Sequence, residues 1–159
     1  MTLEARSMNT DNHLNTQSAP HYAIRFAQSL EELEQNKIVT SLRLLPAEII
    51  GDIDINTDDK SADTIITIKN MVDGRALACP MPLLKTKVAL RDVAVGESLY
   101  VIATDSNSRA DIAAFCQQTQ LSNTAIPLQL VVNHSTLDAT GSASFDTIFH
   151  FIITKTDSN

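Results

Sequence analysis

With 159 residues, the chain is long enough for one ordinary domain with a hydrophobic core, and because it has no tryptophan and few other aromatic residues, that core must be aliphatic. Its net charge of −7, without a basic cluster, argues against a protein that grips nucleic acid phosphates, so we expect no direct nucleic acid partner. No stretch is long and apolar enough to span a membrane, and we expect no membrane partner.

Residues 1–60 are predicted to be an N-terminal extension that is partly disordered. Residues 1–20 are polar and nearly free of large apolar groups, which is typical of disorder, and they lack the apolar core of a signal peptide. A chain without a signal peptide is expected in the cytoplasm, where thiols stay reduced. Because the first third of the extension cannot build a core, we expect a chain starting near Ser61 to fold by itself.

The rest of the extension gives weaker signals. Ser29-Leu30-Glu31-Glu32 has the pattern of a capping box and predicts a short helix over about 30–36. Residues 38–45 are apolar enough for a strand or a docking segment, and the acidic, turn-rich residues 51–63 predict a linker.

Residues 61–157 are predicted to form the folded domain. The predicted elements are, in order, a strand over 64–68, a helix from Pro80 to about Arg91, a strand over 98–103, a helix beginning near Ser108, and strands near 128–132 and 147–153. In the second helix, a buried stripe is indicated by the spacing of Ile112, Phe115, Cys116 and Thr119. This β-α-β-α-β-β order predicts the α+β class, as a two-layer α/β sandwich with two helices on one sheet.

Cys79 lies where the first predicted strand gives way to a helix. Pro80 is predicted at the first helical position and Pro82 within the first turn, where a missing N–H breaks no helical hydrogen bond. The thiol then faces the positive end of the helix dipole, so we expect the pKa of Cys79 to lie below that of a free cysteine. Read alone, the motif is also compatible with a small apolar residue at a strand–helix junction, because free cysteine is among the most buried residue types.

Charged and polar residues near Cys79 are candidates for supporting roles. Arg75, Lys85 and Lys87 could favour the thiolate or attract an acidic partner, although two solvated lysines on a helix explain the pattern equally well. Asp73 and Asp105 are expected to make turn or cap hydrogen bonds. The four histidines show no ligand spacing and there is no Gly-rich phosphate loop, so we expect no metal and no cofactor.

Several blocks of the sequence occur together, in order, in one known family. The blocks are Val72-Asp73, Leu77-x-Cys79-Pro80-x-Pro82, Lys87, Gly96-Glu97, Asp105, and Asp111-Ile112-x-x-Phe115-Cys116. Over roughly residues 65–155 the chain resembles the TusA/SirA family of small sulfur-carrier proteins. It departs from the family pattern at Ala76, where glycine is common, at Thr104 and Ser106 around the aspartate, and at Gln120-Leu121 after the second helix.

The resemblance implies a fold, a reaction and partners. The fold is the same two-layer sandwich, similar to the C-terminal domain of a bacterial translation initiation factor. The reaction is that of a sulfurtransferase: Cys79 takes a sulfane sulfur from a persulfide donor such as a cysteine desulfurase, carries it as a covalent persulfide, and passes it to the cysteine of an acceptor protein. The resemblance leaves the pathway open between tRNA thiolation, cofactor assembly, sulfur oxidation and selenium handling.

Other functions remain as alternatives. In a regulatory or protein-binding module, Cys79 would be a redox-sensing or structural residue and the extension would bind a partner. An RNA-binding domain rests on fold analogy alone, and the acidity opposes it. Cys116 lies on the apolar stripe and is best explained by core packing, while a Cys79–Cys116 disulfide stays open.

Overall fold

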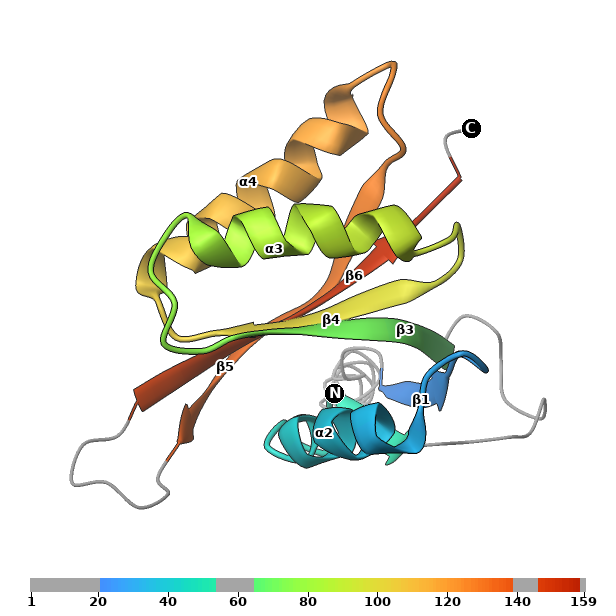
Figure 1. Ribbon diagram of the computed structural model, residues 1–159, viewed down its shortest axis with the longest axis vertical. Coiled ribbons are helices and arrows are strands. Elements are labelled where there is room, and N and C mark those ends of the chain that lie inside the picture. The colour runs from blue at the N-terminus through green and yellow to red at the C-terminus, as the bar shows by residue number, and fades with distance from the viewer. Residues whose placement is uncertain (1–20, 54–64, 139–145, 158–159) are drawn as a thin grey trace, which may run out of the picture.

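The computed structural model describes residues 21–53, 65–138 and 146–157, and these residues form an α+β fold around one mixed sheet (Figure 1). The strands are β1 (Tyr22–Phe26), β2 (Ile50–Ile53), β3 (Ile65–Gly74), β4 (Ser98–Ala103), β5 (Leu128–Asp138) and β6 (Asp146–Lys155). The helices are α2 (Glu32–Leu42), α3 (Met81–Ala89) and α4 (Ser106–Leu121), and a 3-10 turn, η2 (Leu90–Asp92), follows α3. The α+β class predicted from the sequence is confirmed.

The six strands lie in the order β2-β1-β3-β4-β6-β5. The pairs β2–β1, β1–β3 and β3–β4 are parallel. Helix α2 carries the chain back between β1 and β2, and helix α3 does the same between β3 and β4. The pairs β4–β6 and β6–β5 are antiparallel. All six residues of β4 are buried, as expected for a central strand that is covered on both faces.

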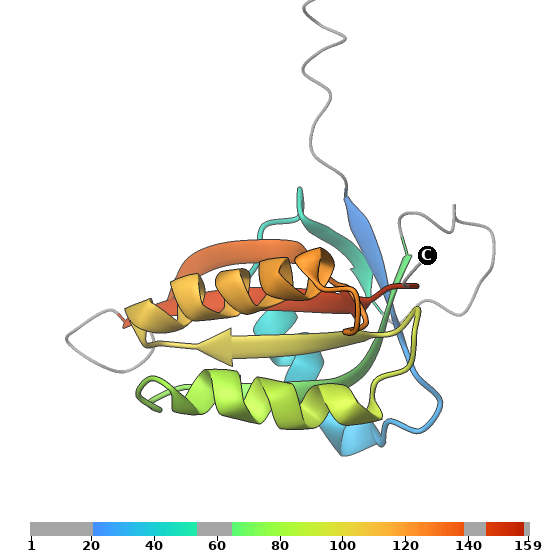
Figure 2. The same cartoon turned by 90° about the horizontal axis from the view of Figure 1, so that it is seen from above.

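Two separate groups of apolar side chains fill the two faces of the sheet. Helices α3 and α4 cover one face, with α3 along β3 and α4 along β5 (Figure 2). The core beneath them includes Leu99, Val101, Ala103, Ile112 and Cys116. Helix α2 covers the opposite face (Figure 1), where the core includes Ile38, Leu42, Tyr100, Ile102 and Ile152.

The two-layer sandwich predicted from the sequence therefore describes only the α3–α4 side. Alternate residues of β4 point to opposite faces, so Tyr100 and Ile102 need a cover that the two predicted helices do not provide. Helix α2 provides that cover and makes a third layer.

Most of the corrections concern the N-terminal extension. Residues 38–42, predicted as part of a strand or docking segment, belong to α2, because Ile38 and Leu42 are four residues apart on one helical face that is buried. The capping box at Ser29 does not form, since Glu31 is the N-cap residue and makes no side-chain cap hydrogen bond. Residues 50–53 form β2 where a linker was predicted to start. The disorder predicted for residues 1–20 and the remainder of that linker lie outside the described residues.

From β3 onward, the predicted elements are present; β4 has the predicted bounds of 98–103, and the other elements have different ends. Helix α4 begins at Ser106, ahead of the predicted start at Ser108, whose hydroxyl is buried without a hydrogen-bond partner among the described residues. Strand β5 extends well beyond its predicted range and β6 slightly beyond, because the two strands pair with each other along their length.

A histidine is buried in the sheet beneath α2. The Tyr100 hydroxyl and His150 Nδ1 lie 2.7 Å apart, and His150 Nε2 lies 2.8 Å from Thr136 Oγ1. His150 is 0% exposed, and its burial, together with the charge of His134, lowers the pKa of His150 to about 4. The folded protein therefore holds this imidazole neutral.

We expect the protein to lose stability in mild acid through His150. The unfolded state, with a histidine pKa of about 6.5, binds this proton more tightly than the folded state. The contribution of neutral His150 to the free energy of unfolding is therefore complete above pH 6.5 and is lost as pH falls to about 4. The loss over that window is about 3 kcal/mol. Urea unfolding at pH 7 and pH 4.5 measures it, with His150→Gln as the non-titrating control. An equal loss in both proteins would contradict the assignment.

Candidate functional site

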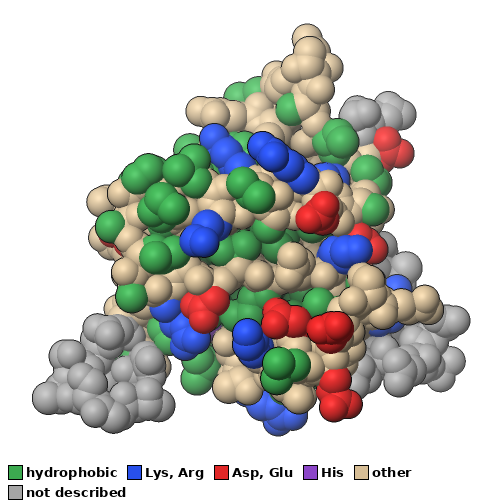
Figure 3. Space-filling view, viewed as in Figure 1, with side chains coloured by type: hydrophobic (Ala, Val, Ile, Leu, Met, Phe, Trp, Pro, Cys, Tyr) green, Lys and Arg blue, Asp and Glu red, His purple; other side chains and the backbone are tan. Residues whose placement is uncertain are grey.

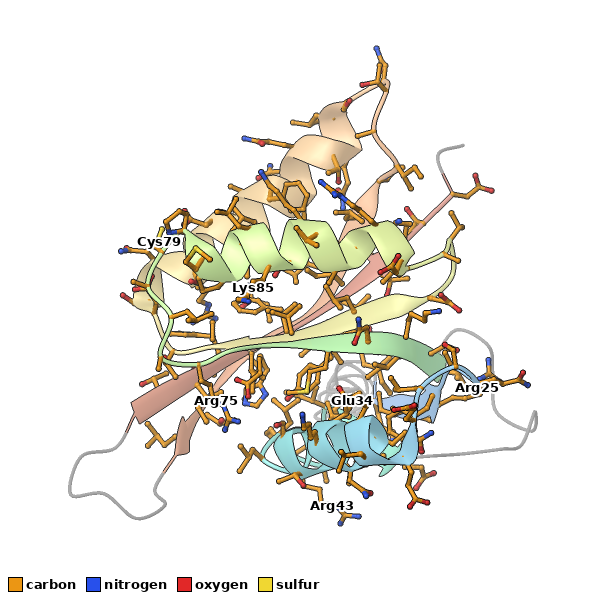
Figure 4. The ribbon with its side chains drawn as sticks, in the orientation of Figure 1. Arg25, Glu34, Arg43, Arg75, Cys79 and Lys85 are labelled. Atoms are coloured by element: carbon orange, nitrogen blue, oxygen red, sulfur yellow. The ribbon has the colours of Figure 1, made fainter. Side chains whose placement is uncertain are left out.

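The site lies in the loop between β3 and α3, at the carboxyl ends of two parallel strands. Strands β3 and β4 run in the same direction side by side. The loop after β3 and the residues that follow β4 therefore meet at the same end of the sheet. The Cys79 backbone N–H donates to Asp105 Oδ2 at 2.8 Å, which fixes the loop to the start of α4. Cys79 is exposed, beside the first turn of α3 (Figure 4).

The two prolines of the motif occupy different surroundings. Pro80 is the N-cap residue of α3, one position before the predicted one, and it is exposed. Pro82 is buried in the first turn, and its carbonyl accepts a hydrogen bond from the Thr86 hydroxyl at 2.8 Å. A Cβ added to Gly74 would lie 3.3 Å from Pro82 Cβ and 3.0 Å from the Ile102 carbonyl oxygen. Glycine at residue 74 thus lets α3 pack closely on the strands and holds the thiol-bearing turn in place.

Two of the departures from the family pattern meet in this loop. Ala76 has φ of +66°, a left-handed conformation that glycine adopts without strain. Its backbone N–H donates to Thr104 Oγ1 at 2.9 Å. The alanine therefore keeps a conformation suited to glycine, with the threonine hydroxyl as a hydrogen-bond partner for its backbone.

The electrostatic surroundings of the thiol differ from the prediction. The Cys79 Sγ–H group donates to Asp111 Oδ2 at 2.9 Å. This hydrogen bond raises the pKa of Cys79, and desolvation and the charges of Asp111 and Asp105 raise it further. The predicted lowering of the Cys79 pKa is wrong, because a full negative charge in contact with the sulfur outweighs the partial charge of a helix terminus.

The three cations predicted to support the thiol do not contact it. Arg75 pairs with Asp73, with Nη2 to Oδ2 at 2.8 Å, on the opposite side of β3 from Cys79 (Figure 4). The Asp73 carboxylate also accepts the Arg75 backbone N–H, as expected for a turn residue. Lys87 lies over the ring of Phe115, with Nζ 5.0 Å from its centroid.

Lys85 lies on the other side of α3, along a groove. The groove has a volume of about 580 Å³ and runs between α3 and the edge of β3. Its α3 wall carries exposed apolar side chains, namely Met81, Leu84 and Val88. Figure 3 shows hydrophobic and basic side chains interspersed over this face. Met81, two residues after Cys79, is among the residues that line the groove.

The second cysteine is part of the core, as predicted. Cys116 is 2% exposed on the inner face of α4, and burial raises its pKa to about 11. Both cysteines are free thiols. Nothing in the arrangement gives Cys116 access to a partner protein.

Timed alkylation of the native protein is expected to label Cys79 first and Cys116 only on unfolding, because a reagent reaches only the exposed sulfur. Mass spectrometry of the two cysteine peptides against time measures the order. Labelling of Cys116 at the same rate as Cys79 would show that the core around α4 opens.

Asp105 and Asp111 are the site residues whose role sequence reasoning missed. Asp105 was expected to make a turn or cap hydrogen bond, but it makes no side-chain cap hydrogen bond and binds the Cys79 backbone. A signal was present: Asp105 lies two residues after the strand predicted over 98–103, and the carboxyl ends of adjacent parallel strands, as β3 and β4 are, meet. Asp111 could not be placed in the same way, because its contact depends on how α4 packs.

Neither a candidate metal centre nor a membrane-spanning helix occurs within the described ranges. No group of three or more His, Cys, Asp or Glu residues there could hold a metal ion. In the same part of the chain, no helix has the length and apolarity needed to cross a membrane.

Comparison with known proteins places this site within a matched segment. The family model for the sulfurtransferase TusA matches residues 70–126, from the second half of β3 to the end of the loop after α4. A Halobacterium salinarum protein named as a candidate sulfur carrier is 48% identical over 59 residues, which are 37% of this chain and 70% of that protein.

Two further relatives match over shorter stretches. The sulfur carrier protein TusA of Allochromatium vinosum is 44% identical over 48 residues, 30% of this chain and 63% of that protein. YrkF of Bacillus subtilis, also named as a candidate sulfur carrier, is 45% identical over 49 residues, 31% of this chain. The chain spans only 26% of the length of YrkF.

Proposed function

Because the chain belongs to the TusA family of sulfur carriers, we propose that Cys79 accepts a sulfane sulfur as a persulfide and passes it to an acceptor protein. The observation that carries the proposal is the exposed thiol of Cys79 inside the matched segment, on a residue whose backbone N–H is held by Asp105. Transfer between two proteins needs an accessible sulfur and a docking face more than a deep pocket. We propose that the carrier acts in the cytoplasm without a cofactor.

Loading exchanges one sulfur–sulfur bond for another. The Cys79 sulfur attacks the outer sulfur of a donor persulfide, the donor's own sulfur–sulfur bond breaks, and the donor leaves as a thiol. A cysteine desulfurase is the proposed donor. The acceptor cysteine then attacks the outer sulfur on Cys79 in the same way, and tRNA thiolation is one pathway that such an acceptor would serve.

The test is mass spectrometry after incubation with a persulfidated cysteine desulfurase. We expect one added sulfur on the Cys79 peptide and none on the Cys116 peptide, and the added sulfur should leave on treatment with a reducing thiol. Absence of the adduct would favour the alternative, a redox-sensing or regulatory protein-binding module without sulfur transfer.

Lys85 and Lys87 are expected to assist docking of an acidic partner, although they do not contact the thiol. Replacing either with alanine should slow transfer from a protein donor at low salt, and the difference should shrink as salt screens the charges. Transfer kinetics at two salt concentrations measure the effect. If transfer were independent of salt and unchanged in both variants, the docking role would be excluded while Cys79 would remain the carrier.

A further inference from the structure

The thiol hydrogen of Cys79 is held by a carboxylate from another helix. Asp111 lies in the second turn of α4, and its Oδ2 accepts the Sγ–H hydrogen bond at 2.9 Å. Asp105 has a different contact, since its Oδ2 accepts the backbone N–H of the same residue. Of the two carboxylates, Asp111 touches the atom that reacts and Asp105 positions the residue that carries it.

No neighbouring cation neutralises Asp111 in the described part of the chain. Lys87, on α3, is placed over Phe115. Arg109, on α4, donates from Nε to Asn133 at 3.2 Å and lies over the ring of Phe149. Arg75, in the loop, forms an ion pair with Asp73 at the end of β3. The groups that act on the thiol are therefore the two carboxylates, and the proton lies between sulfur and Asp111.

We propose that Asp111 is a catalytic residue that holds the thiol proton between transfers and accepts it when Cys79 attacks the outer sulfur of the donor. The inference rests on the proposed function. A bond forms between Cys79 Sγ and the outer sulfur, which keeps its own proton, while the donor's sulfur–sulfur bond breaks. The donor sulfur leaves as a thiolate and takes the proton from Asp111, so that nothing is oxidised or reduced overall.

Proton transfer from a resting thiol to a carboxylate is uphill, because the thiol is the weaker acid. The new sulfur–sulfur bond removes the negative charge from Cys79 as that charge develops, so attack and proton transfer proceed together. Between transfers the thiol stays neutral, and neutral thiols are poor nucleophiles toward oxidants and electrophiles. When the sulfur is handed on, Asp111 returns to Cys79 the proton that the acceptor thiol gives up.

The experiment compares two reactions of Cys79 in the full chain at pH 7. One is alkylation by iodoacetamide, whose rate follows the thiolate fraction. The other is sulfur gain from glutathione persulfide, a small donor that does not depend on protein docking. In Asp111→Asn, which keeps an oxygen acceptor but loses the charge, we expect faster alkylation with a lower pH midpoint and slower sulfur gain, by at least about tenfold.

Two matched variants complete the design. Asp111→Glu keeps the carboxylate and should recover part of the rate of sulfur gain. Glu48→Gln removes an exposed carboxylate from the loop between α2 and β2 and should change neither reaction. Thermal unfolding of each variant checks that the fold is retained, and Asp111→Ala serves in place of Asp111→Asn if the amide does not fold.

The outcomes separate this inference from the proposed function. If sulfur gain in Asp111→Asn rose together with alkylation, Asp111 would only suppress the thiolate, and its catalytic role would be overturned. Unchanged rates in both reactions would overturn it as well. If the unmodified protein gained no sulfur on Cys79 from either glutathione persulfide or the protein donor, the proposed function would fail first and this inference with it.

Discussion

Replacing Cys79 with serine is expected to abolish sulfur loading while leaving the fold unchanged. The side chain is exposed, and serine can still donate a hydrogen bond to Asp111, so little packing is lost. A hydroxyl in place of the thiol cannot form the sulfur–sulfur bond that the transfer needs. Mass spectrometry of the loaded protein and thermal unfolding measure the two effects.

Cys116→Ala is the matched control for that substitution. The variant should load sulfur normally, because Cys116 is 2% exposed and lies in the apolar core beneath α4, where a partner protein does not reach it. It should lower the free energy of unfolding by about 1 kcal/mol or more, as is usual when a packed side chain is shortened. Residual loading of Cys79→Ser, lost only when Cys116 is also replaced, would show that the carrier role had been given to the wrong cysteine.

Removal of residues 1–60 is expected to prevent cooperative folding, the opposite of the expectation from sequence. The deletion would remove β1, α2 and β2, and with them six large buried apolar side chains: Ile24, Leu30, Ile38, Leu42, Leu45 and Ile50. Each contributes about 2 kcal/mol when buried, and a domain's net stability is only about 5–15 kcal/mol. The truncated chain would also expose Tyr100 and Ile102 in the central strand. Calorimetry should show no sharp transition.

A pair of point substitutions in α2 tests the same claim in the intact chain. Leu42 is 1% exposed and Leu33 is 68% exposed on the same helix. Leu42→Ala should lower the free energy of unfolding by about 2–5 kcal/mol, whereas Leu33→Ala should change it little. Denaturant unfolding gives both values. Equal small effects would mean that α2 contributes no stability to the sheet.

The part of the fold that was predictable is the part with local signals. The β-branched residues at the start of β3 and the apolar residues of β4 have strand patterns that are visible without any partner. The pairing of β1 with β3 has no local signal. Paired residues such as Arg25 and Thr67 are far apart in the sequence and are separated by an acidic, turn-rich segment. Strand β1 has five residues, of which the adjacent Ala23 and Ile24 are buried, so it lacks the alternation of buried and exposed residues that marks a strand in a sequence.

The site was predictable to the same extent. The prolines around Cys79 place it at a helix start, which is a local property. The charges that act on the sulfur are not local, since Asp111 belongs to another helix. Lys85 and Lys87 are near Cys79 in sequence, but they lie four and six residues after Met81, the first residue of α3, which is roughly 6 and 9 Å along the helix axis. Distance along the chain therefore suggested the wrong sign for the shift in the pKa of Cys79.

The position of β6 between β4 and β5 has a consequence for how the protein is made. Among the described strands β6 is the last in the chain, yet it pairs with both of these neighbours. As synthesis proceeds from the N-terminus, the edge of β4 that pairs with β6 stays unpaired until β6 emerges from the ribosome. During that interval Val101 and Ile102 belong to an open edge, which other nascent chains can pair with. Chaperone binding during synthesis should therefore concentrate on β4.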